Sequence, residues 1–247
     1  WGQAINFHGP QSHHVRQFFC DNALMWLRDY HFDALRLDAV HAIVDTSAVH
    51  ILEQLSSQVT RLATQTRRHL GLIAESDLND PRVVSPHAIG GYGIQHQWSD
   101  DFHHTLHTVL TGERDGYYAD FGSLADLAKA LERVFVYDGR YSSFRQRRHG
   151  RPPAGLPGCS FLGYLQNHDQ IGNRARGERS AHLMSLARTK VAAALVLTSP
   201  FIPMLFQGEE WGASTPFQYF TDHEDLKLGR AVTEGPRREF AAFAAHA

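Results

Sequence analysis

Three apolar runs in this chain end in acidic side chains, and a helix-like stretch lies between them. The runs are Leu35–His41, Ile73–Asp77 and Gln166–Gln170, and their acids are Asp38, Glu75 and Asp169. A β/α barrel delivers catalytic side chains to one rim in this way, because they come from the C-terminal ends of different strands. Converging carboxylates are also what cleavage of a glycosidic bond requires. The pattern therefore predicts a sugar-cleaving β/α barrel.

The composition is compatible with one α/β domain that buries a sizeable core. The chain has 247 residues, of which 43% are hydrophobic and 20% charged, with a formal net charge of −2. This charge gives no reason to expect nucleic acid or an anionic membrane as a partner. The basic run Arg145–Arg151 lies among Gly and Pro residues and is interpreted as a solvated loop. No apolar run reaches the roughly 20 residues of a membrane span, so no membrane partner is expected.

The cysteines and the first residues bear on the compartment. Cys20 and Cys159 sit in apolar settings without a close partner in sequence, which favours the reducing cytoplasm. The start of the sequence shows no basic segment followed by an apolar core, so no signal peptide is expected. We therefore expect a cytoplasmic protein.

Hydrophobic spacing predicts helices that alternate with strands. Helices are expected at residues 15–29, 47–68, 124–134, 181–197 and 234–246. Strands are expected at residues 32–40, 70–74, 94–98, 161–166 and 204–207. Residues 140–158, rich in Gly, Pro and Arg, are expected to form a loop. The count gives about five barrel strands, whereas a closed barrel of this type has eight.

Strand alternation predicts which side chains face the interior of the barrel. Side chains two positions apart share a face, so Arg36 and Asp38 point one way along the first strand. By the same rule Ile73 and Glu75 share a face of the second strand. The spacing between Asp38 and Glu75 accommodates one crossover helix of a βαβ unit. The two acids are therefore expected on adjacent parallel strands.

Each feature also has a simpler structural interpretation. A carboxylate at a strand end is often a helix N-cap or the partner of an arginine, although three such acids together are harder to explain this way. The pair His103 and His107 has the i, i+4 spacing of zinc ligands, but no third ligand follows at a recognisable spacing, so no metal is expected. The aromatic side chains near the strand ends can belong to the core or stack on pyranose rings. These aromatic residues are Trp98, Phe102, Tyr117, Tyr118, Trp211 and Tyr219.

Together, the three acidic runs resemble conserved regions of the α-amylase superfamily, glycoside hydrolase family 13. These are the runs Arg36–His41, Ala74–Glu75 and Asn167–Asp169. Further runs are similar to one branch, the maltooligosyltrehalose trehalohydrolases. They are Ala74–Val83, Trp98–His104, Leu110–Arg114, Gln166–Arg174 and Pro216–His223. The resemblance covers essentially the whole chain.

The resemblance implies a role for each matching position. Asp38 matches the nucleophile, Glu75 the general acid/base, and Asp169 the carboxylate that stabilises the transition state. Arg36 matches the arginine that orients the nucleophile, and His168 matches a histidine that hydrogen-bonds the sugar. A neighbouring arginine keeps a carboxylate ionised. Asp38 beside Arg36 is thus the expected nucleophile, and Glu75, without such a neighbour in sequence, is the expected acid.

A second group of residues follows the strand expected between those of Glu75 and Asp169. We expect this group to bind substrate on the leaving-group side. The group consists of Trp98, Asp100, Asp101, His103 and His104. A site that hydrogen-bonds a particular polar group discriminates against substrates that lack it. On this hypothesis, Asp101→Ala harms cleavage of maltooligosyl trehalose more than cleavage of plain maltooligosaccharide.

The resemblance also implies a fold and a reaction. The fold is an α/β TIM barrel of the α-amylase type, incomplete, with about its last five β/α units. Residues 1–247 would be the C-terminal part of the catalytic barrel, without its N-terminal part and without a C-terminal β-domain. The reaction is hydrolysis of the α-1,4 bond next to the terminal trehalose of maltooligosyl trehalose, after a maltooligosyl trehalose synthase has acted. No cofactor is expected. The alternatives are another α-glucan-active enzyme, such as a branching enzyme or amylase, and an inactive glucan-binding fragment.

Overall fold

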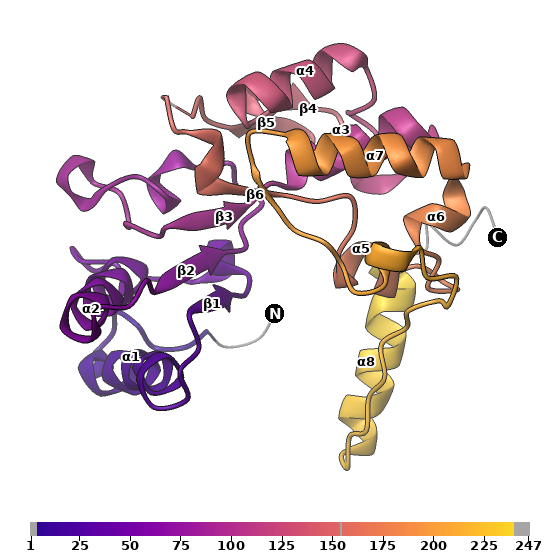
Figure 1. Ribbon diagram of the computed structural model, residues 1–247. Helices are drawn as coiled ribbons and strands as arrows, with labels where there is room; N and C mark the ends of the chain where they lie inside the picture. Colours follow the sequence, from indigo (N-terminus) through magenta and orange to yellow (C-terminus); the bar gives the residue numbers. More distant parts are fainter. Residues whose placement is uncertain (1–3, 154, 240–247) are drawn as a thin grey trace.

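The computed structural model describes residues 4–153 and 155–239 and is built around one parallel sheet (Figure 1). The sheet contains β1 (Ala34–Leu37), β2 (Gly71–Ala74), β3 (His96–Trp98), β6 (Phe161–Gly163) and β7 (Ile202–Pro203). Its strand order is β1-β2-β3-β6-β7, and all neighbouring strands are parallel. Four of the expected strands overlap β1, β2, β3 and β6, and a fifth strand, β7, lies just before its expected place. β3 lies between the strands that precede Glu75 and Asp169.

Helices connect most of these strands and cover one face of the sheet. In Figure 1, α1 and α2 lie beside β1 and β2 at one end of the sheet, whereas α3, α4 and α7 lie beyond β3 and β6, towards its other end. The helices are α1 (Ser12–Arg28), α2 (Ile51–Thr66), α3 (Asp100–Thr111), α4 (Leu124–Arg133), α5 (His168–Gly172), α6 (Ser180–Leu183), α7 (Leu186–Thr198) and α8 (Leu226–Glu239). Short 3-10 turns occupy Val40–Ala42, Pro81–Val83, His87–Ile89, Gly116–Tyr118, Gly158–Ser160 and Glu209–Trp211.

The two faces of the sheet carry two hydrophobic clusters, as strand alternation predicts. Leu72 and Ala74 of β2 are fully buried in the large cluster between sheet and helices. Ile73, which lies between them in sequence, instead packs with Trp98 and Tyr164 in a smaller cluster on the opposite face. Side chains that share the Ile73 face therefore point to the side that forms the interior of a barrel.

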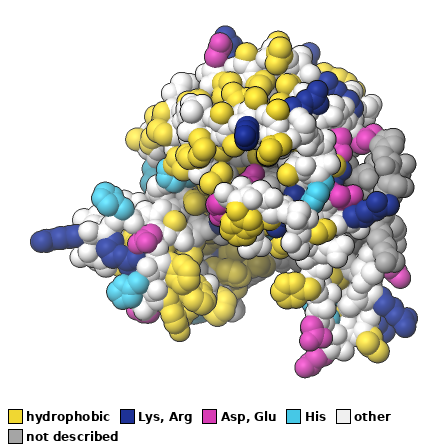
Figure 2. Space-filling model, turned by 45° about the vertical axis from the view of Figure 1, so that its right-hand side comes forward, with side chains coloured by type: hydrophobic (Ala, Val, Ile, Leu, Met, Phe, Trp, Pro, Cys, Tyr) yellow, Lys and Arg dark blue, Asp and Glu magenta, His cyan; other side chains and the backbone are white. Residues whose placement is uncertain are grey.

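The sheet is open at both sides within the described residues, because β1 and β7 each pair along one edge only. Large apolar side chains are exposed along α7 near the β7 edge, including Leu186 at 71% and Leu197 at 56%. Figure 2 shows hydrophobic side chains gathered across the upper part of the molecule, at the height of α7 in Figure 1. Large contiguous apolar patches are rare on the surfaces of soluble proteins. Where they occur, they are typical of surfaces that pack against another segment or another molecule.

Two helices, α3 and the short α5, were not expected from the sequence. Residues 100–111 form α3, which Ser99 caps by accepting a hydrogen bond from the backbone N–H of Phe102. Two aspartates occupy its first turn, where carboxylates favour the positive end of the helix dipole, and Gly112 ends it with a left-handed φ of 84°. These capping signals are visible in the sequence.

The expectation of a loop at residues 140–158 is wrong for its first half. Residues Asp138–Ser142 (β4) and Arg147–Gly150 (β5) form an antiparallel hairpin apart from the main sheet. The turn is held by Asp120, whose carboxylate accepts hydrogen bonds from the hydroxyls of Ser142 and Ser143. A partner more than 20 residues away in sequence thus orders a segment whose own composition favours a loop.

Two predicted elements near the end of the chain differ in position. The last strand is Ile202–Pro203 rather than 204–207, because the parallel pairing with β6 reaches only Leu162 and Gly163. The helix predicted at 234–246 overlaps α8, and its residues 240–246 lie outside the described part of the chain. Among the residues that the structure describes, no helix is long and apolar enough to cross a membrane.

Candidate active site

Asp38 and Glu75 follow two neighbouring strands at the same end of the sheet. The last paired residues of β1 and β2 are Leu37 and Ala74, which lie opposite each other in register. The backbone N–H of Glu75 donates to the carbonyl of Leu37 at 2.9 Å, which extends the pairing by one step. The prediction that the two acids occupy adjacent parallel strands is confirmed.

Arg36 lies between the two acids. One of its guanidinium nitrogens donates a hydrogen bond to the Asp38 carboxylate, and its Nη2 lies 3.0 Å from Oε2 of Glu75. The sequence-based argument that gave this arginine to Asp38 alone is therefore wrong, because a residue two positions away in sequence and one on the next strand are equally reachable. Arg36 cannot by itself distinguish a nucleophile from an acid.

Exposure and backbone contacts do distinguish the two carboxylates. The Asp38 side chain is 79% exposed, whereas that of Glu75 is 21% exposed. Oε2 of Glu75 also accepts a hydrogen bond of 2.7 Å from the backbone N–H of Ala39. Ala39 has a left-handed φ of 44°, a conformation that non-glycine residues adopt at a cost and that clusters at functional sites. Glu75 thus holds the turn that presents Asp38.

Asp169 reaches the same rim from the first turn of α5. Asn167 caps this short helix by accepting hydrogen bonds from the backbone N–H groups of Asp169 and Gln170. Oδ1 of Asp169 accepts a hydrogen bond of 2.9 Å from the hydroxyl of Tyr219, and Nε2 of His168 lies 3.5 Å from Oδ2. The side chains of Asp169 and His168 remain 39% and 38% exposed, so both can meet a ligand.

Trp98 joins the parts of the rim. The guanidinium carbon of Arg36 lies 4.5 Å from the centroid of the Trp98 ring, close enough for cation–π attraction. The edge of the same ring contacts His168, with ring centroids 6.0 Å apart. Trp98 therefore links Arg36, which contacts Asp38 and Glu75, to the residue beside Asp169. The structure brings all three predicted carboxylates to one rim.

Asp100 lies at the start of α3, behind this rim. The hydroxyl of Tyr164 donates a hydrogen bond to its carboxylate. Burial, opposed by the Tyr164 hydrogen bond and reinforced by the charge of Glu75, raises the pKa of Asp100 to about 7. Asp100 therefore adds a carboxyl group that can stay protonated near neutral pH.

Asp101 serves the scaffold, contrary to its predicted place in the substrate site. It is only 4% exposed. Its Oδ2 accepts hydrogen bonds from the backbone N–H groups of Val136 and Tyr137 and from the side chain of Asn79. Burial raises its pKa to about 6 in spite of these donors. A carboxylate with this set of partners fixes the segment before the β4–β5 hairpin.

His103 and His104 are also buried, at 0% and 9% exposure. The ring of His103 is hydrogen-bonded at both nitrogens, to the carbonyl of Leu165 at 2.7 Å and to the hydroxyl of Tyr118 at 2.9 Å. His107, the i+4 residue, pairs with Glu113. No group of three or more metal-ligating side chains that could hold an ion occurs in residues 4–153 and 155–239. The histidines of α3 thus lie in the protein interior and not at the rim.

Tyr219 is the contact that sequence reasoning missed. The sequence indicates only that it is one of several aromatic residues that can stack on sugar. The run Pro216–His223 contains it, but nothing in that run indicates that its hydroxyl reaches Asp169, 50 residues earlier. Only the folded chain brings the two together.

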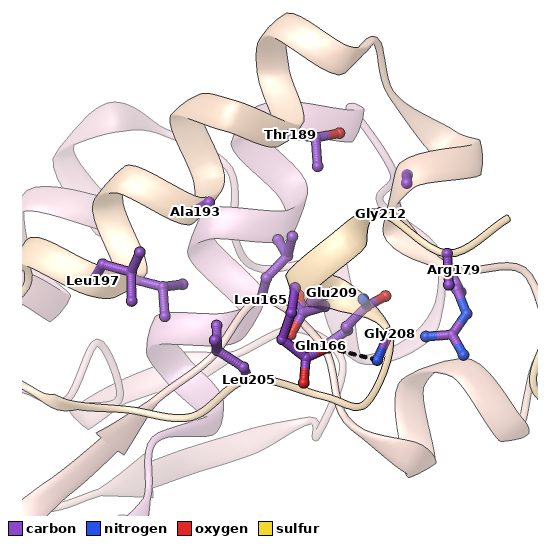
Figure 3. Close-up of a pocket in the computed structure, with 14 residues that line it drawn as sticks. Leu165, Gln166, Arg179, Thr189, Ala193, Leu197, Leu205, Gly208, Glu209 and Gly212 are labelled. Atoms are coloured by element: carbon purple, nitrogen blue, oxygen red, sulfur yellow. Dashed lines mark hydrogen bonds between the residues drawn. The ribbon is translucent and has the colours of Figure 1, made fainter.

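A pocket of about 340 Å³ lies away from this rim, between α7 and the segment after β7 (Figure 3). Its lining contains none of the predicted site residues. Leu197, Ala193 and Leu205 give it an apolar wall, and burial raises the pKa of Glu209 at its floor to about 7. The pocket borders the open β7 edge, so it belongs with the apolar patch on α7.

The comparison with solved structures defines the class. A crystal structure of a candidate α-amylase from Salmonella typhimurium superposes with a TM-score of 0.82 at 40% identity, over 93% of this chain and 39% of that one. Cyclic α-maltosyl-(1→6)-maltose hydrolase from Arthrobacter globiformis, at 16% identity and a TM-score of 0.52, shares the fold. The described sheet and its helices are part of a (β/α)8 barrel of the α-amylase type, in incomplete form.

The comparison with curated proteins narrows the class. The chain is 54% identical over 97% of its length to malto-oligosyltrehalose trehalohydrolase from Rhizobium sp. (strain M-11), and 51% identical over 98% to that of Mycobacterium tuberculosis. It spans about two fifths of these relatives, 41% and 42% of their lengths. No family model matches. Nearly the whole chain is therefore similar to one part of the malto-oligosyltrehalose trehalohydrolases.

Proposed function

We propose that the protein hydrolyses the α-1,4-glucosidic bond next to the terminal trehalose of maltooligosyl trehalose and releases trehalose. The observation that carries the proposal is the rim on which the Arg36 guanidinium contacts both Asp38 and Glu75. Two carboxyl groups that contact one guanidinium suit a retaining double displacement, in which such groups stand about 5–5.5 Å apart. The names of the relatives supply the substrate.

Each carboxylate has one task in this mechanism. Glu75, held by the Ala39 N–H, protonates the departing glucosidic oxygen while the exposed Asp38 attacks the anomeric carbon. Glu75, now a carboxylate, then takes a proton from the water that resolves the glycosyl-enzyme. Asp169 accepts hydrogen bonds from sugar hydroxyls as positive charge develops on the ring, and His168 binds the same sugar.

The relevant experiment compares two substrates of equal length in the full-length protein. One is a maltooligosyl trehalose and the other a plain malto-oligosaccharide. We expect free trehalose from the first, a newly formed reducing end of α configuration by proton NMR, and much slower cleavage of the second. Equal rates on both substrates favour a general amylase, and transfer to a second glucan with α-1,6 bond formation favours a branching enzyme. Binding without turnover indicates a glucan-binding protein.

We also propose that residues 1–247 are the C-terminal part of the catalytic barrel and that earlier strands close it. The unpaired edges of β1 and β7 support this, since a closed barrel has no edges. Expressed alone, the 247 residues should associate or aggregate and release little trehalose. The upstream segment, fused or supplied in trans, should restore a monodisperse, active protein. A fully active monomer of the 247 residues alone contradicts this arrangement.

The cellular setting follows from the same proposal. The substrate is the product of a maltooligosyl trehalose synthase, so the protein acts after such an enzyme. Cys20 and Cys159 are both free thiols, which supports a cytoplasmic location. The proposed reaction requires no cofactor and no nucleic-acid or membrane partner.

A further inference from the structure

Tyr219 contacts Asp169 from a segment between β7 and α8. Its hydroxyl lies 2.9 Å from Oδ1 of Asp169 and 3.1 Å from the carbonyl oxygen of His168, so its one proton is shared between these acceptors. The other Asp169 oxygen faces Nε2 of His168 at 3.5 Å. Of these two contacts to the Asp169 carboxylate in the described part of the chain, the hydrogen bond from Tyr219 is therefore the shorter.

The segment that carries Tyr219 is fastened at three points to residues 177–182. Nε of Arg179 donates to the carbonyl of Thr215 at 2.7 Å, and Arg179 is only 7% exposed. The backbone N–H of Phe217 donates to the carbonyl of Gly177 at 3.0 Å. The ring of His182 bonds the carbonyl of Ser214 at 2.9 Å. The backbone of residues 214–217, which precedes Tyr219, therefore holds this residue near Asp169 in addition to its hydroxyl.

Two glycines make this close approach possible. A Cβ at position 172, on α5, would lie 2.6 Å from Cζ of the Tyr219 ring. A Cβ at position 177 would lie 2.2 Å from the carbonyl oxygen of Phe217, and Gly177 also has a φ of +65°. Any larger residue at either position would push the segment outward. The backbone that follows Asp169 is thus shaped to receive the Tyr219 segment.

We propose that Tyr219 is a positioning residue, which holds the Asp169 carboxylate in the orientation that the reaction needs. This rests on the proposed function, in which Asp169 stabilises the transition state. Asp169 lies on the first turn of a five-residue helix and is 39% exposed, so packing alone does not fix its side chain. A catalytic carboxylate must be held within a fraction of an ångström by groups that are themselves fixed. The fastened Tyr219 ring meets this requirement.

The first test is Tyr219→Phe in the full-length protein, which removes only the hydroxyl. A lost hydrogen bond to an ionised group corresponds to a decrease of about 10- to 100-fold in kcat, with KM changed by less than about threefold. Tyr30→Phe is the matched control, because it removes the same atom from an exposed tyrosine between α1 and β1. It should leave both constants unchanged. A Tyr219→Phe enzyme with wild-type kcat overturns the proposal.

The second test asks whether Tyr219 acts through Asp169. If it does, adding Tyr219→Phe to Asp169→Asn should lower the residual turnover by less than about twofold, since residues that act as a unit are not additive. Losses that multiply overturn the proposal. If Asp169→Asn itself keeps full turnover, the role of Asp169 in the proposed function is wrong.

A third measurement does not depend on turnover. Burial and the neighbouring Asp169 carboxylate hold the pKa of the Tyr219 phenol well above its ordinary value. With ¹³Cζ-labelled tyrosine, an alkaline NMR titration should therefore show Tyr219 ionising at lower pH in Asp169→Asn than in the wild type. Tyr219→Phe assigns the signal. An unchanged titration means that the two side chains do not interact, whatever substrate the enzyme uses.

Discussion

Two carboxylates of this chain, Asp38 and Asp101, both follow a parallel strand closely, yet their surroundings differ completely. Asp38 is 79% exposed and is contacted by a single arginine. Asp101 is 4% exposed, and its Oδ2 accepts three hydrogen bonds from two backbone N–H groups and Asn79. The first has oxygen lone pairs available to a ligand, whereas the second uses its capacity to hold a distant segment.

The comparison shows that a place at a strand end does not define a function. Buried polar groups must be hydrogen-bonded inside the protein, so their partners are scaffold atoms. A group that acts on substrate needs open acceptor positions and supports that leave those positions free. Asp101 and His103 of α3 are bonded to the scaffold in this way, whereas Asp38 and Asp169 at the rim keep exposed oxygens. The predictions below test this division.

The largest effect is expected at the rim. Glu75→Gln should lower turnover about 10²- to 10⁴-fold, because it removes the proton donor and keeps the shape. Asp38→Asn should be at least as damaging, because no covalent intermediate can form. Both variants should still bind α-glucan, as measured by isothermal titration calorimetry, and the exposed Asp38 should matter little to folding. Unchanged turnover in Glu75→Gln would remove Glu75 from the mechanism.

Asp101→Ala, in contrast to the rim variants, should mainly lower the free energy of unfolding. It leaves the N–H groups of Val136 and Tyr137 and the Asn79 amide without their acceptor. Orphaned buried donors cost roughly 1–3 kcal/mol each, so a loss of about 3 kcal/mol or more in the free energy of unfolding is expected. Urea denaturation measures it, with Asp38→Asn as the control that changes it by less than about 0.5 kcal/mol.

The activity of Asp101→Ala on two substrates shows whether Asp101 belongs to the scaffold or to the substrate site. If Asp101 only holds the scaffold, cleavage of maltooligosyl trehalose and of plain maltooligosaccharide should fall together. A selective loss on the trehalose-capped substrate, with unchanged stability, restores Asp101 to the substrate site.

The buried histidines of α3 should make the fold sensitive to acid. Burial, with smaller contributions from His107 and Arg145, lowers the pKa of His104 to about 3, whereas an unfolded histidine titrates near 6.5. Between these values the unfolded chain binds one more proton, so stability falls as the pH falls below about 6.5. His104→Phe keeps the ring packed against Tyr117 and Phe121 and removes the proton. As the pH falls, the free energy of unfolding of His104→Phe should therefore decrease less steeply than that of the wild type, and the two slopes should differ by about 1.4 kcal/mol per pH unit.

Urea denaturation at several pH values between about 6.5 and 4 checks this difference in slope. Parallel curves for the wild type and His104→Phe mean that His104 protonates in the folded state as readily as in the unfolded chain.

The sequence predicted the strands and the rim because both depend on local patterns. Alternation along β1 and β2 indicates which face carries Arg36 and Glu75, and the crossover length makes the strands adjacent. The prediction that Asp101 and His103 bind substrate was wrong, because burial depends on contacts with residues that are distant in sequence. Asp101 and His103 look like ligands in sequence, and only Val136, Leu165 and their neighbours, brought in by the fold, occupy their polar atoms. The Tyr219 contact was hidden for the same reason.

The smallest effect is expected at Trp98, which belongs to both regions. Its ring lies under the Arg36 guanidinium and against Tyr164, so it packs the interior and also supports the rim. Trp98→Phe retains an aromatic face but weakens a cation–π attraction of roughly 0.5–2 kcal/mol. We therefore expect kcat/KM to fall about two- to fivefold, with Tm lowered by a few degrees.

Trp26→Phe is the matched control, because Trp26 is partly exposed and its ring contacts the exposed aromatic residues Tyr30 and Phe32. It should leave kcat/KM unchanged. If Trp98→Phe behaves like this control, the Arg36 contact does not help the rim. A loss greater than about 100-fold, which is about 2.7 kcal/mol, instead means that Trp98 contacts the sugar directly, because it exceeds the roughly 2 kcal/mol that the cation–π contact with Arg36 can supply. The size of the effect thus decides whether Trp98 belongs with the supports or with the substrate site.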